Sequence, residues 1–276
     1  MKIYIAVDME GISGICSPEY VLKDGKLYAI GQRLATEDTN AAIRGAFDGG
    51  ADEVIVADMH GASLNLLAEQ LDSRAKLFAG APRSPRFPFL DETVSGMALI
   101  GYHAKAGTEG GNLEHTRSSK GWFKYCVNGV PYGEASIDAE IAAWCGVPVV
   151  MASGDNYLCA EVKEMLGEQV ETAQVKIGLG RQAALSLSPN EGQSRVYAAM
   201  KRACERLVNG EHFALAQKNT PVAVQTTYKF TPDADAASTV YGARRIDGYT
   251  VEMNYPRLVD AYGGTWKEHS GLSSVF

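Results

Sequence analysis

Short apolar runs separated by helical segments are the feature of this 276-residue sequence that most restricts its fold. The runs are rich in β-branched residues and are bounded by Gly, Pro or Asp, as buried strands commonly are. We expect strands at 3–7, 53–57, 76–79, 97–100, 147–151 and 170–177. Continuous apolar strands of this kind are typical of parallel sheets covered on both faces. The sequence therefore predicts an α/β fold, with a mainly parallel sheet flanked by helices.

Helix-forming residues fill several intervals between these runs. We predict helices at 36–47, 134–144 and 190–208, the first of which ends at Gly49-Gly50 as helices often do. The segment 122–132 indicates two strands joined by a tight Asn128-Gly129 turn. The sequence pattern changes near Ser153-Gly154, and this change predicts an N-terminal α/β domain over 1–153 and a smaller C-terminal α/β subdomain over 154–276.

The charge balance excludes several classes of partner. With 26 Lys and Arg against 33 Asp and Glu, the net charge is −7 and no basic run is present, so we expect neither nucleic acid nor an anionic membrane surface as a partner. No uncharged stretch approaches the roughly 20 apolar residues of a membrane span. The five cysteines are scattered and lack a C-x-x-C pair, which predicts free thiols and a cytoplasmic location.

Polar side chains follow three of the predicted strands. In open parallel sheets, ligands bind beyond the carboxyl ends of the strands. Asp8 and Glu10 follow the first run, and in an extended backbone their side chains would point to the same side. His60 follows the second run and His103 the fourth. Mixed carboxylate and imidazole ligation suits Zn²⁺, with Mn²⁺ or Co²⁺ as alternatives.

Each of these residues also has a structural interpretation when taken singly. Asp8 could cap a turn, and a lone histidine at a strand end is commonly structural. His115 lies in a glycine-containing polar loop and is either a general acid/base or an exposed loop histidine. Glu134 opens a predicted helix, where the helix dipole favours an acidic residue in any case. Together, the strand-end residues predict a site for a divalent metal in the N-terminal domain.

A competing motif lies further along the chain. The segment 178–183 matches G-x-G-x-x-A after a strand, which could cradle a dinucleotide on a helix N-terminus. Pro189 would end the following helix after barely two turns, and no strand ending in Asp or Glu follows at the expected distance. The sequence also lacks a G-x-S-x-G elbow, a P-loop and H-E-x-x-H. A nicotinamide-dependent enzyme is therefore the weaker interpretation.

Five short motifs identify a known family. They are VDMEGISG at 7–14, ADMHG at 57–61, GYHA at 101–104, the loop around His115, and GEASIDA at 133–139. In this order and at similar separations, they resemble the motifs of the M55 metallopeptidases, the D-aminopeptidases of the DppA type. The resemblance extends from residue 1 to about residue 190, whereas the tail at 263–276 looks little like the family.

The resemblance implies a binuclear zinc aminopeptidase, with two ions per subunit. In it, Asp8 corresponds to the carboxylate that bridges the ions, Glu10 and His103 to further ligands of one ion, and His60 and Glu134 to those of the other. His115 corresponds to the catalytic histidine. The implied reaction is the release of N-terminal D-amino acids from small peptides such as D-Ala-D-Ala through a metal-activated water, inside a ring-like homodecamer.

Two other functional classes stay open at the level of sequence. Another binuclear metallohydrolase, a phosphoesterase or an amidohydrolase, could use the same ligands, although Arg117 is the nearest cation that could clamp a phosphate. A non-catalytic peptide-binding protein would differ from both by holding no metal tightly.

Overall fold

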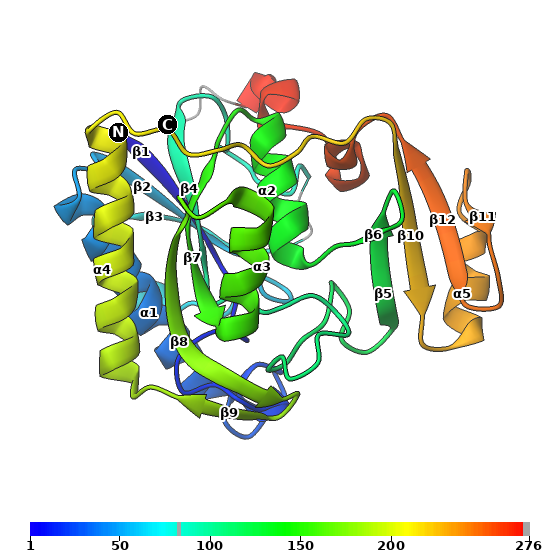
Figure 1. Ribbon diagram of the computed structural model, residues 1–276, viewed down its shortest axis with the longest axis horizontal. Coiled ribbons are helices and arrows are strands. Elements are labelled where there is room, and N and C mark those ends of the chain that lie inside the picture. The colour runs from blue at the N-terminus through cyan, green and yellow to red at the C-terminus, as the bar shows by residue number, and fades with distance from the viewer. Residues whose placement is uncertain (82–83, 273–276) are drawn as a thin grey trace.

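Two β-sheets organise the chain in a computed structural model that describes residues 1–81 and 84–272 (Figure 1). The larger sheet is parallel except at one edge, where the last two strands pair antiparallel. Its seven strands lie in the order β3 (Lys76–Phe78), β2 (Glu53–Asp58), β1 (Lys2–Val7), β4 (Val94–Ile100), β7 (Val149–Asp155), β8 (Glu171–Gly180) and β9 (Ala183–Ser186). The predicted α/β fold is confirmed.

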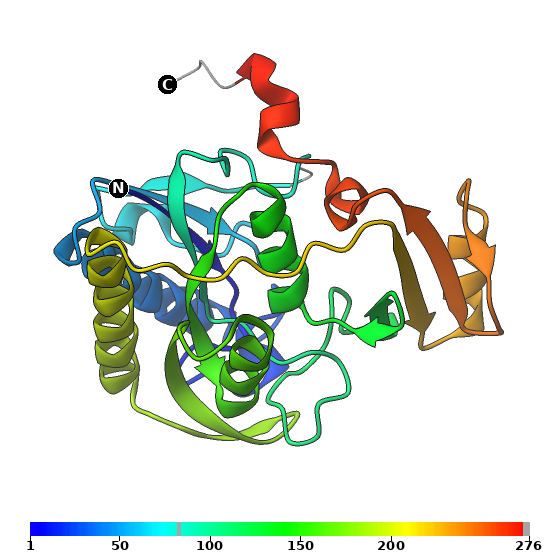
Figure 2. The ribbon, with the colours of Figure 1, turned by 45° about the horizontal axis from the view of Figure 1, so that its top comes forward.

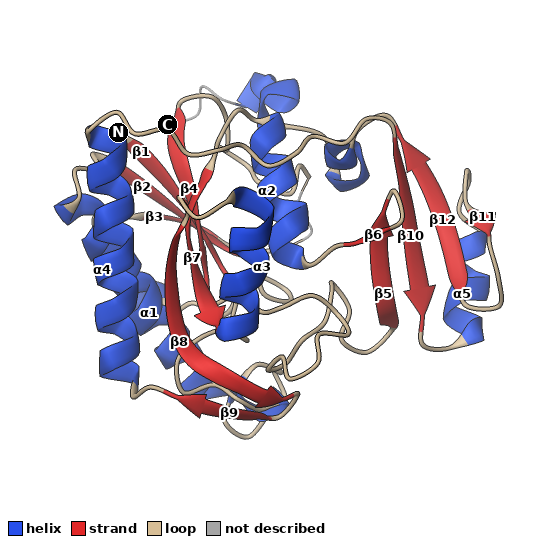
Figure 3. Ribbon diagram, viewed as in Figure 1, coloured by secondary structure: helices blue, strands red, loops and turns tan. Residues whose placement is uncertain are grey.

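Helices cover both faces of this sheet (Figures 1 and 3). One face carries α1 (Tyr28–Asp48) and α4 (Pro189–Val208), and the other carries α2 (Glu134–Trp144) and α3 (Asn156–Leu166). The side chains of β1 alternate accordingly, because Ile3 and Ile5 belong to the core under α1 and α4, whereas Tyr4 and Ala6 belong to the core under α2 and α3.

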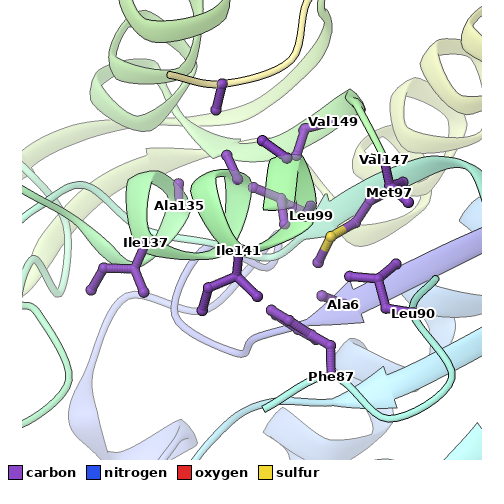
Figure 4. Close-up of a cluster of buried hydrophobic side chains, with 14 of the residues drawn as sticks. Ala6, Phe87, Leu90, Met97, Leu99, Ala135, Ile137, Ile141, Val147 and Val149 are labelled. Carbon is purple, nitrogen blue, oxygen red and sulfur yellow. The ribbon is translucent and has the colours of Figure 1, made fainter. Parts of the chain in front are cut away.

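The core under α2 combines aliphatic side chains with aromatic rings such as Phe87 and Tyr4. Figure 4 shows Ile137 and Ile141 of α2 in the same cluster as Leu99 of β4 and Phe87. All four side chains are at most 2% exposed. This packing fixes the start of α2 against the sheet, which matters below because the helix begins at Glu134.

All three predicted helices exist, one with the predicted bounds and two with altered bounds. The helix predicted at 134–144 has the bounds of α2, and the one predicted at 190–208 starts one residue earlier, at Pro189. The first helix begins at Tyr28, eight residues before the predicted start at 36. α3 lies outside the predicted helices because it follows β7 without an intervening turn, capped by Asp155, whose carboxylate accepts from the Leu158 amide at 2.8 Å.

The smaller sheet is antiparallel and lies to one side of the larger one (Figure 1). Its strands lie in the order β11 (Arg244–Arg245), β12 (Thr250–Tyr255), β10 (Val222–Tyr228), β5 (Trp122–Val127) and β6 (Val130–Pro131), with α5 (Thr231–Ser238) after β10. The predicted Asn128-Gly129 hairpin joins β5 to β6, and both turn residues have the positive φ, 50° and 81°, that this turn requires.

The two sheets divide the chain differently from the boundary predicted between residues 153 and 154. That position lies inside β7, and β8, β9 and α4 beyond it complete the larger sheet. The smaller sheet contains β5 and β6 from the first half of the chain and β10 to β12 from the second half. A long segment after α4 connects the larger sheet to β10 (Figure 2). The change of sequence pattern near residue 153 marks the end of a buried strand and not a domain boundary. The pairing of strands that are distant in the sequence leaves no local signal from which the two sheets could be predicted.

The segment 178–183, which matches a dinucleotide-binding motif, forms the tip of the antiparallel β8–β9 hairpin. A strand, not a helix, follows its glycines, so the segment does not form the helix N-terminus that cradles a pyrophosphate. None of the helices formed by residues 1–81 and 84–272 combines the length and the apolar character of a membrane span.

Gly11 marks the closest approach between the loops that follow β1 and β4. Its amide donates to the Gly101 carbonyl at 2.7 Å, and a Cβ at this position would lie 1.9 Å from the Tyr102 carbonyl oxygen. Since that atom belongs to the backbone, it cannot move aside as a flexible side chain would. A side chain at Gly11 would therefore push the two loops apart.

We predict that Gly11→Ala lowers the free energy of unfolding by about 2–3 kcal/mol, because the added methyl group overpacks a rigid contact. Urea unfolding followed by circular dichroism measures this loss. Gly248→Ala is the matched control, since a Cβ there meets no atom within 4 Å, and its expected change is within about 0.5 kcal/mol. Equal stabilities for Gly11→Ala and the wild type would contradict the prediction.

Candidate metal centre

Three neighbouring parallel strands, β2, β1 and β4, end at the same edge of the larger sheet. Main-chain hydrogen bonds continue beyond the strand ends, from the Asp8 amide to the Ile100 carbonyl at 2.8 Å and from the Met59 amide to the Val7 carbonyl at 2.8 Å. The segments that carry Asp8, His60 and His103 are therefore fixed by the sheet itself.

Asp8 and Glu10 do face the same site, but not through an extended backbone. β1 ends at Val7, and the next residues form a turn in which the Ile12 amide donates to the Met9 carbonyl at 3.2 Å. The His60 Nδ1 atom lies 2.9 Å from Asp8 Oδ1 and 3.1 Å from Glu10 Oε2. The turn therefore brings both carboxylates to one imidazole.

The second oxygen of Asp8 faces the other histidines. His103 Nε2 lies 3.5 Å from Asp8 Oδ2 and 3.5 Å from Glu134 Oε1, and His115 Nε2 lies 3.6 Å from the same glutamate oxygen. The rings of His103 and His115 stack, with centroids 4.0 Å apart and planes 8° apart. All six side chains singled out in the sequence thus converge, and Asp8 lies between the two groups of partners.

Each histidine is held by a backbone carbonyl through the ring nitrogen that points away from the carboxylates. His60 Nε2 donates to the Val21 carbonyl at 2.8 Å, His103 Nδ1 to that of Ala104 at 3.0 Å, and His115 Nδ1 to that of Leu113 at 2.9 Å. Since a carbonyl only accepts, the other nitrogen of each neutral ring carries the lone pair. All three lone pairs therefore face the carboxylates, as a metal site requires.

The electrostatics of the site favour positive charge. Burial disfavours ionised carboxylates, but contacts with His103 and His60 outweigh it and hold the pKa of Asp8 well below its ordinary value. Burial likewise disfavours charged imidazoles, but Glu10 and Asp8 raise the pKa of His60 far above its ordinary value. By contrast, burial and the neighbouring His103 lower the pKa of His115. In the absence of a metal, His60 therefore holds a proton beside the carboxylates of Asp8 and Glu10, and a metal cation bound there would take the place of that proton.

Two buried polar atoms at the centre, Glu10 Oε2 and His103 Nε2, have no hydrogen-bond partner among the described residues. Glu10 Oε2 lies 3.1 Å from His60 Nδ1 as an ion pair, without forming a hydrogen bond to it. Ligand atoms of Asp8, Glu10 and His103 lie within 4.8 Å of one another, as do those of His103, His115 and Glu134. Orphaned carboxylate and imidazole atoms in overlapping groups fit zinc, which takes both kinds of ligand.

The loop after Glu10 is held by a buried cation that no sequence motif indicated. Lys176 of β8 is 2% exposed, and its Nζ donates to the carbonyls of Glu10, Ile12 (3.3 Å) and Ile15 (2.5 Å). Burial lowers the pKa of Lys176 to about 8, against the attraction of Asp155 and Glu10. These bonds fix the main chain on which Glu10 stands, across a sequence separation that leaves no local pattern.

Asp58 and Arg117 position two other predicted ligands. The Asp58 carboxylate accepts from the amides of Asn65 at 2.6 Å and Leu66 at 3.0 Å, and the Asn65 side chain donates to the His60 carbonyl at 2.7 Å. The Arg117 amide donates to Glu134 Oε1 at 2.8 Å, and its guanidinium lies 3.7 Å from Oε2. The only sequence signals for these residues are their places beside the ADMHG motif and the His115 loop.

A cavity of about 390 Å³ opens onto the centre. This volume is at the small end of the range of about 300–1,000 Å³ for ligand pockets. Ionisable side chains of both signs line the cavity, among them Asp8, Glu10, His60, His115, Arg117, Glu134 and Lys120. The arrangement can hold a metal next to a small polar ligand.

Comparisons with known proteins agree with this chemistry. A family model described as Peptidase M55, D-aminopeptidase, matches residues 1–266. A D-aminopeptidase of Bacillus subtilis (strain 168) is 37% identical over 194 residues, which cover 68% of each chain. A solved structure of the zinc-dependent D-aminopeptidase DppA from Bacillus subtilis, described as a self-compartmentalizing protease, is similar with a TM-score of 0.88 and 31% identity, covering 95% of this chain and 94% of that one.

Asp38 of α1 anchors the loop after Glu10 from the other side. It is 1% exposed and accepts from the Ser13 amide at 3.4 Å and the Ser13 hydroxyl at 3.3 Å. Burial raises the pKa of Asp38 from 3.8 to about 7. Between these values the folded state keeps a proton that the unfolded state releases, so this group's contribution to stability is lost as the pH rises through that window.

We therefore predict that metal-free Asp38→Asn and wild-type protein unfold with similar free energies near pH 4, and that the variant is more stable by about 1–3 kcal/mol at pH 8. Urea unfolding at a series of pH values measures the difference. The exposed Asp24→Asn serves as the control and should follow the wild type throughout. Parallel pH curves for Asp38→Asn and the wild type would refute the prediction.

Proposed function

Because this chain belongs to the Peptidase M55 family of D-aminopeptidases, we propose that it is a zinc-dependent aminopeptidase that releases N-terminal D-amino acids from short peptides. The observation that carries this proposal is the convergence of three buried carboxylates and three oriented imidazoles at a centre that opens to one small cavity. The family match favours a peptide substrate over the phosphate esters that a similar centre could bind.

Five residues are proposed to hold two zinc ions, namely Asp8, Glu10, His60, His103 and Glu134. The two oxygens of Asp8 face different histidines, which supports a bridging role. The closeness of Asp8, Glu10 and His103 supports placing Glu10 and His103 on one ion. His60 lies beside Glu10 as well as Asp8, so the assignment of His60 and Glu134 to the second ion stays a prediction.

Zinc bound at this centre would lower the pKa of a water molecule and polarise the scissile carbonyl group. His115 is proposed as the catalytic residue, because its Nε2 atom faces the cavity while Nδ1 is held by the Leu113 carbonyl. From that position it can take a proton from the attacking water and pass it to the leaving amine, a role typically worth about 10²–10⁴ in rate. Arg117 keeps Glu134 in place.

We also propose that the protein acts as a homo-oligomer. The solved relative is described as self-compartmentalizing, and the smaller sheet region exposes large apolar side chains, among them Phe123, Tyr241 and Tyr249. The decamer that the resemblance implies stays a prediction. The five cysteines are free thiols, which supports a reducing compartment such as the cytoplasm.

The proposed function predicts about two zinc ions per chain and hydrolysis of D-Ala-D-Ala in preference to L-Ala-L-Ala, with activity lost on chelation and restored by zinc. Elemental analysis and release of free alanine are measured on one preparation. Bound zinc without hydrolysis of either peptide would point to another metallohydrolase. Absence of tightly bound metal would contradict the site itself and favour a binding protein.

We predict that His115→Ala keeps the zinc content of the wild type and loses about 10²–10⁴ in kcat, because the variant removes proton transfer and leaves the five proposed ligands in place. Zinc content and steady-state kinetics are measured together. His212→Ala is the matched control, since His212 is exposed and outside the cavity lining. Near-wild-type kcat in His115→Ala at full zinc content would remove His115 from the mechanism.

A further inference from the structure

Three cationic side chains line the cavity, Arg117, Lys120 and Arg181. They contrast with the buried carboxylates of Asp8 and Glu10, which line it too. The cavity is therefore bipolar, with carboxylates and imidazoles where the strands end and cations on the loops. A small ligand with opposite charges at its two ends matches such a distribution.

Two of the three cations already have partners. The Arg117 guanidinium lies 3.7 Å from Glu134 Oε2 and 5.7 Å from the centre of the Tyr262 ring. Arg181 Nη1 lies 2.8 Å from Glu114 Oε1 and also donates to the Glu114 carbonyl. Both guanidinium groups are thus engaged in contacts that fix loops around the site.

Lys120 differs from both arginines. Its ammonium group has no ion-pair or hydrogen-bond partner among residues 1–81 and 84–272, and the residue is exposed. Its backbone, in contrast, is held on both sides. The Gly121 amide donates to the Ser118 hydroxyl at 3.0 Å, and Lys229 at the end of β10 donates through Nζ to the Ser119 carbonyl at 2.6 Å. A fixed backbone with a free ammonium group is suited to receive an anion from the cavity.

We propose that Lys120 is a specificity-determining residue that binds the free α-carboxylate of a dipeptide substrate. The inference rests on the proposed function, which places the N-terminal residue and the scissile bond at the metal ligands. A dipeptide extends about 7 Å along its backbone, so its carboxylate lies one residue from the scissile bond, within the same cavity. Because Arg117 is paired with Glu134 and Arg181 with Glu114, Lys120 is the cavity-lining cation that is left to bind this carboxylate.

The test compares D-Ala-D-Ala with D-Ala-D-Ala amide, which lacks the carboxylate charge. The wild type should prefer the free acid. Lys120→Met should reduce kcat/KM for the acid by about two- to fivefold through KM, the size expected for a partly exposed charge pair, and should leave kcat/KM for the amide unchanged. Lys120→Arg should restore most of the preference. Lys124→Met is the matched control, an exposed lysine outside the cavity lining, and should leave the preference unchanged.

Three outcomes would overturn the inference. An unchanged preference for the acid in Lys120→Met would mean that another group binds the carboxylate. An equal loss on acid and amide would mean that Lys120 acts on the loop and not on the charge. If the zinc-loaded wild type hydrolyses neither peptide, the proposed function fails and this inference fails with it. If the wild type does hydrolyse the amide, the proposed function stands, and a negative result then concerns the Lys120 assignment alone.

Discussion

Buried negative charge at the ends of three parallel strands is the constraint on which the rest of the molecule depends. Asp8, Glu10 and Glu134 are each less than 10% exposed, and the effective cost of burying an ion in a protein is several kcal/mol unless it is compensated. Each imidazole beside them offers a lone pair to a metal once it gives up any proton that it shares with a carboxylate, because its other nitrogen is bound to a carbonyl. Carboxylate oxygens and imine nitrogens repel one another unless a cation lies between them. The fold thus creates a demand for positive charge.

Groups outside the ligand set hold this arrangement through the backbone. Lys176 binds the carbonyls that follow Glu10, Asp58 fixes the loop after His60, and Arg117 donates its amide to Glu134. Each of the proposed ligands is thus tied to the sheet or to a helix end. Such support is what keeps ligand geometry within the narrow tolerance that metal chemistry requires.

The sequence predicted the larger sheet and the convergence of the strand-end side chains because both depend on local patterns. Apolar runs mark buried strands, and parallel strands end at one edge of a sheet. Asp8, His60 and His103 could therefore be predicted to lie together from these patterns alone, without the family resemblance. Glu134 needed the family resemblance, since a glutamate at a helix start has a sufficient explanation in the helix dipole. Lys176 lies 166 residues from Glu10 and gave no signal. The same limit explains the division of the chain, where pairing through space joins β5 to β10.

The smaller sheet acts on the site although it contributes none of the proposed metal ligands. The segment that carries His115, Arg117 and Lys120 leads directly into β5, and Lys229 at the end of β10 holds it from the other side. The proposed metal ligands thus lie mainly on the larger sheet and on α2, whereas the groups proposed to face the substrate lie on a segment anchored to the smaller sheet. Changes in the smaller sheet can therefore alter the substrate wall, while the strand ends of the larger sheet keep Asp8, His60 and His103 in place. The two supports meet at Glu134, which begins α2 and accepts from the Arg117 amide at 2.8 Å. A change in the segment that carries Arg117 is thus expected to affect both the substrate wall and this one proposed ligand.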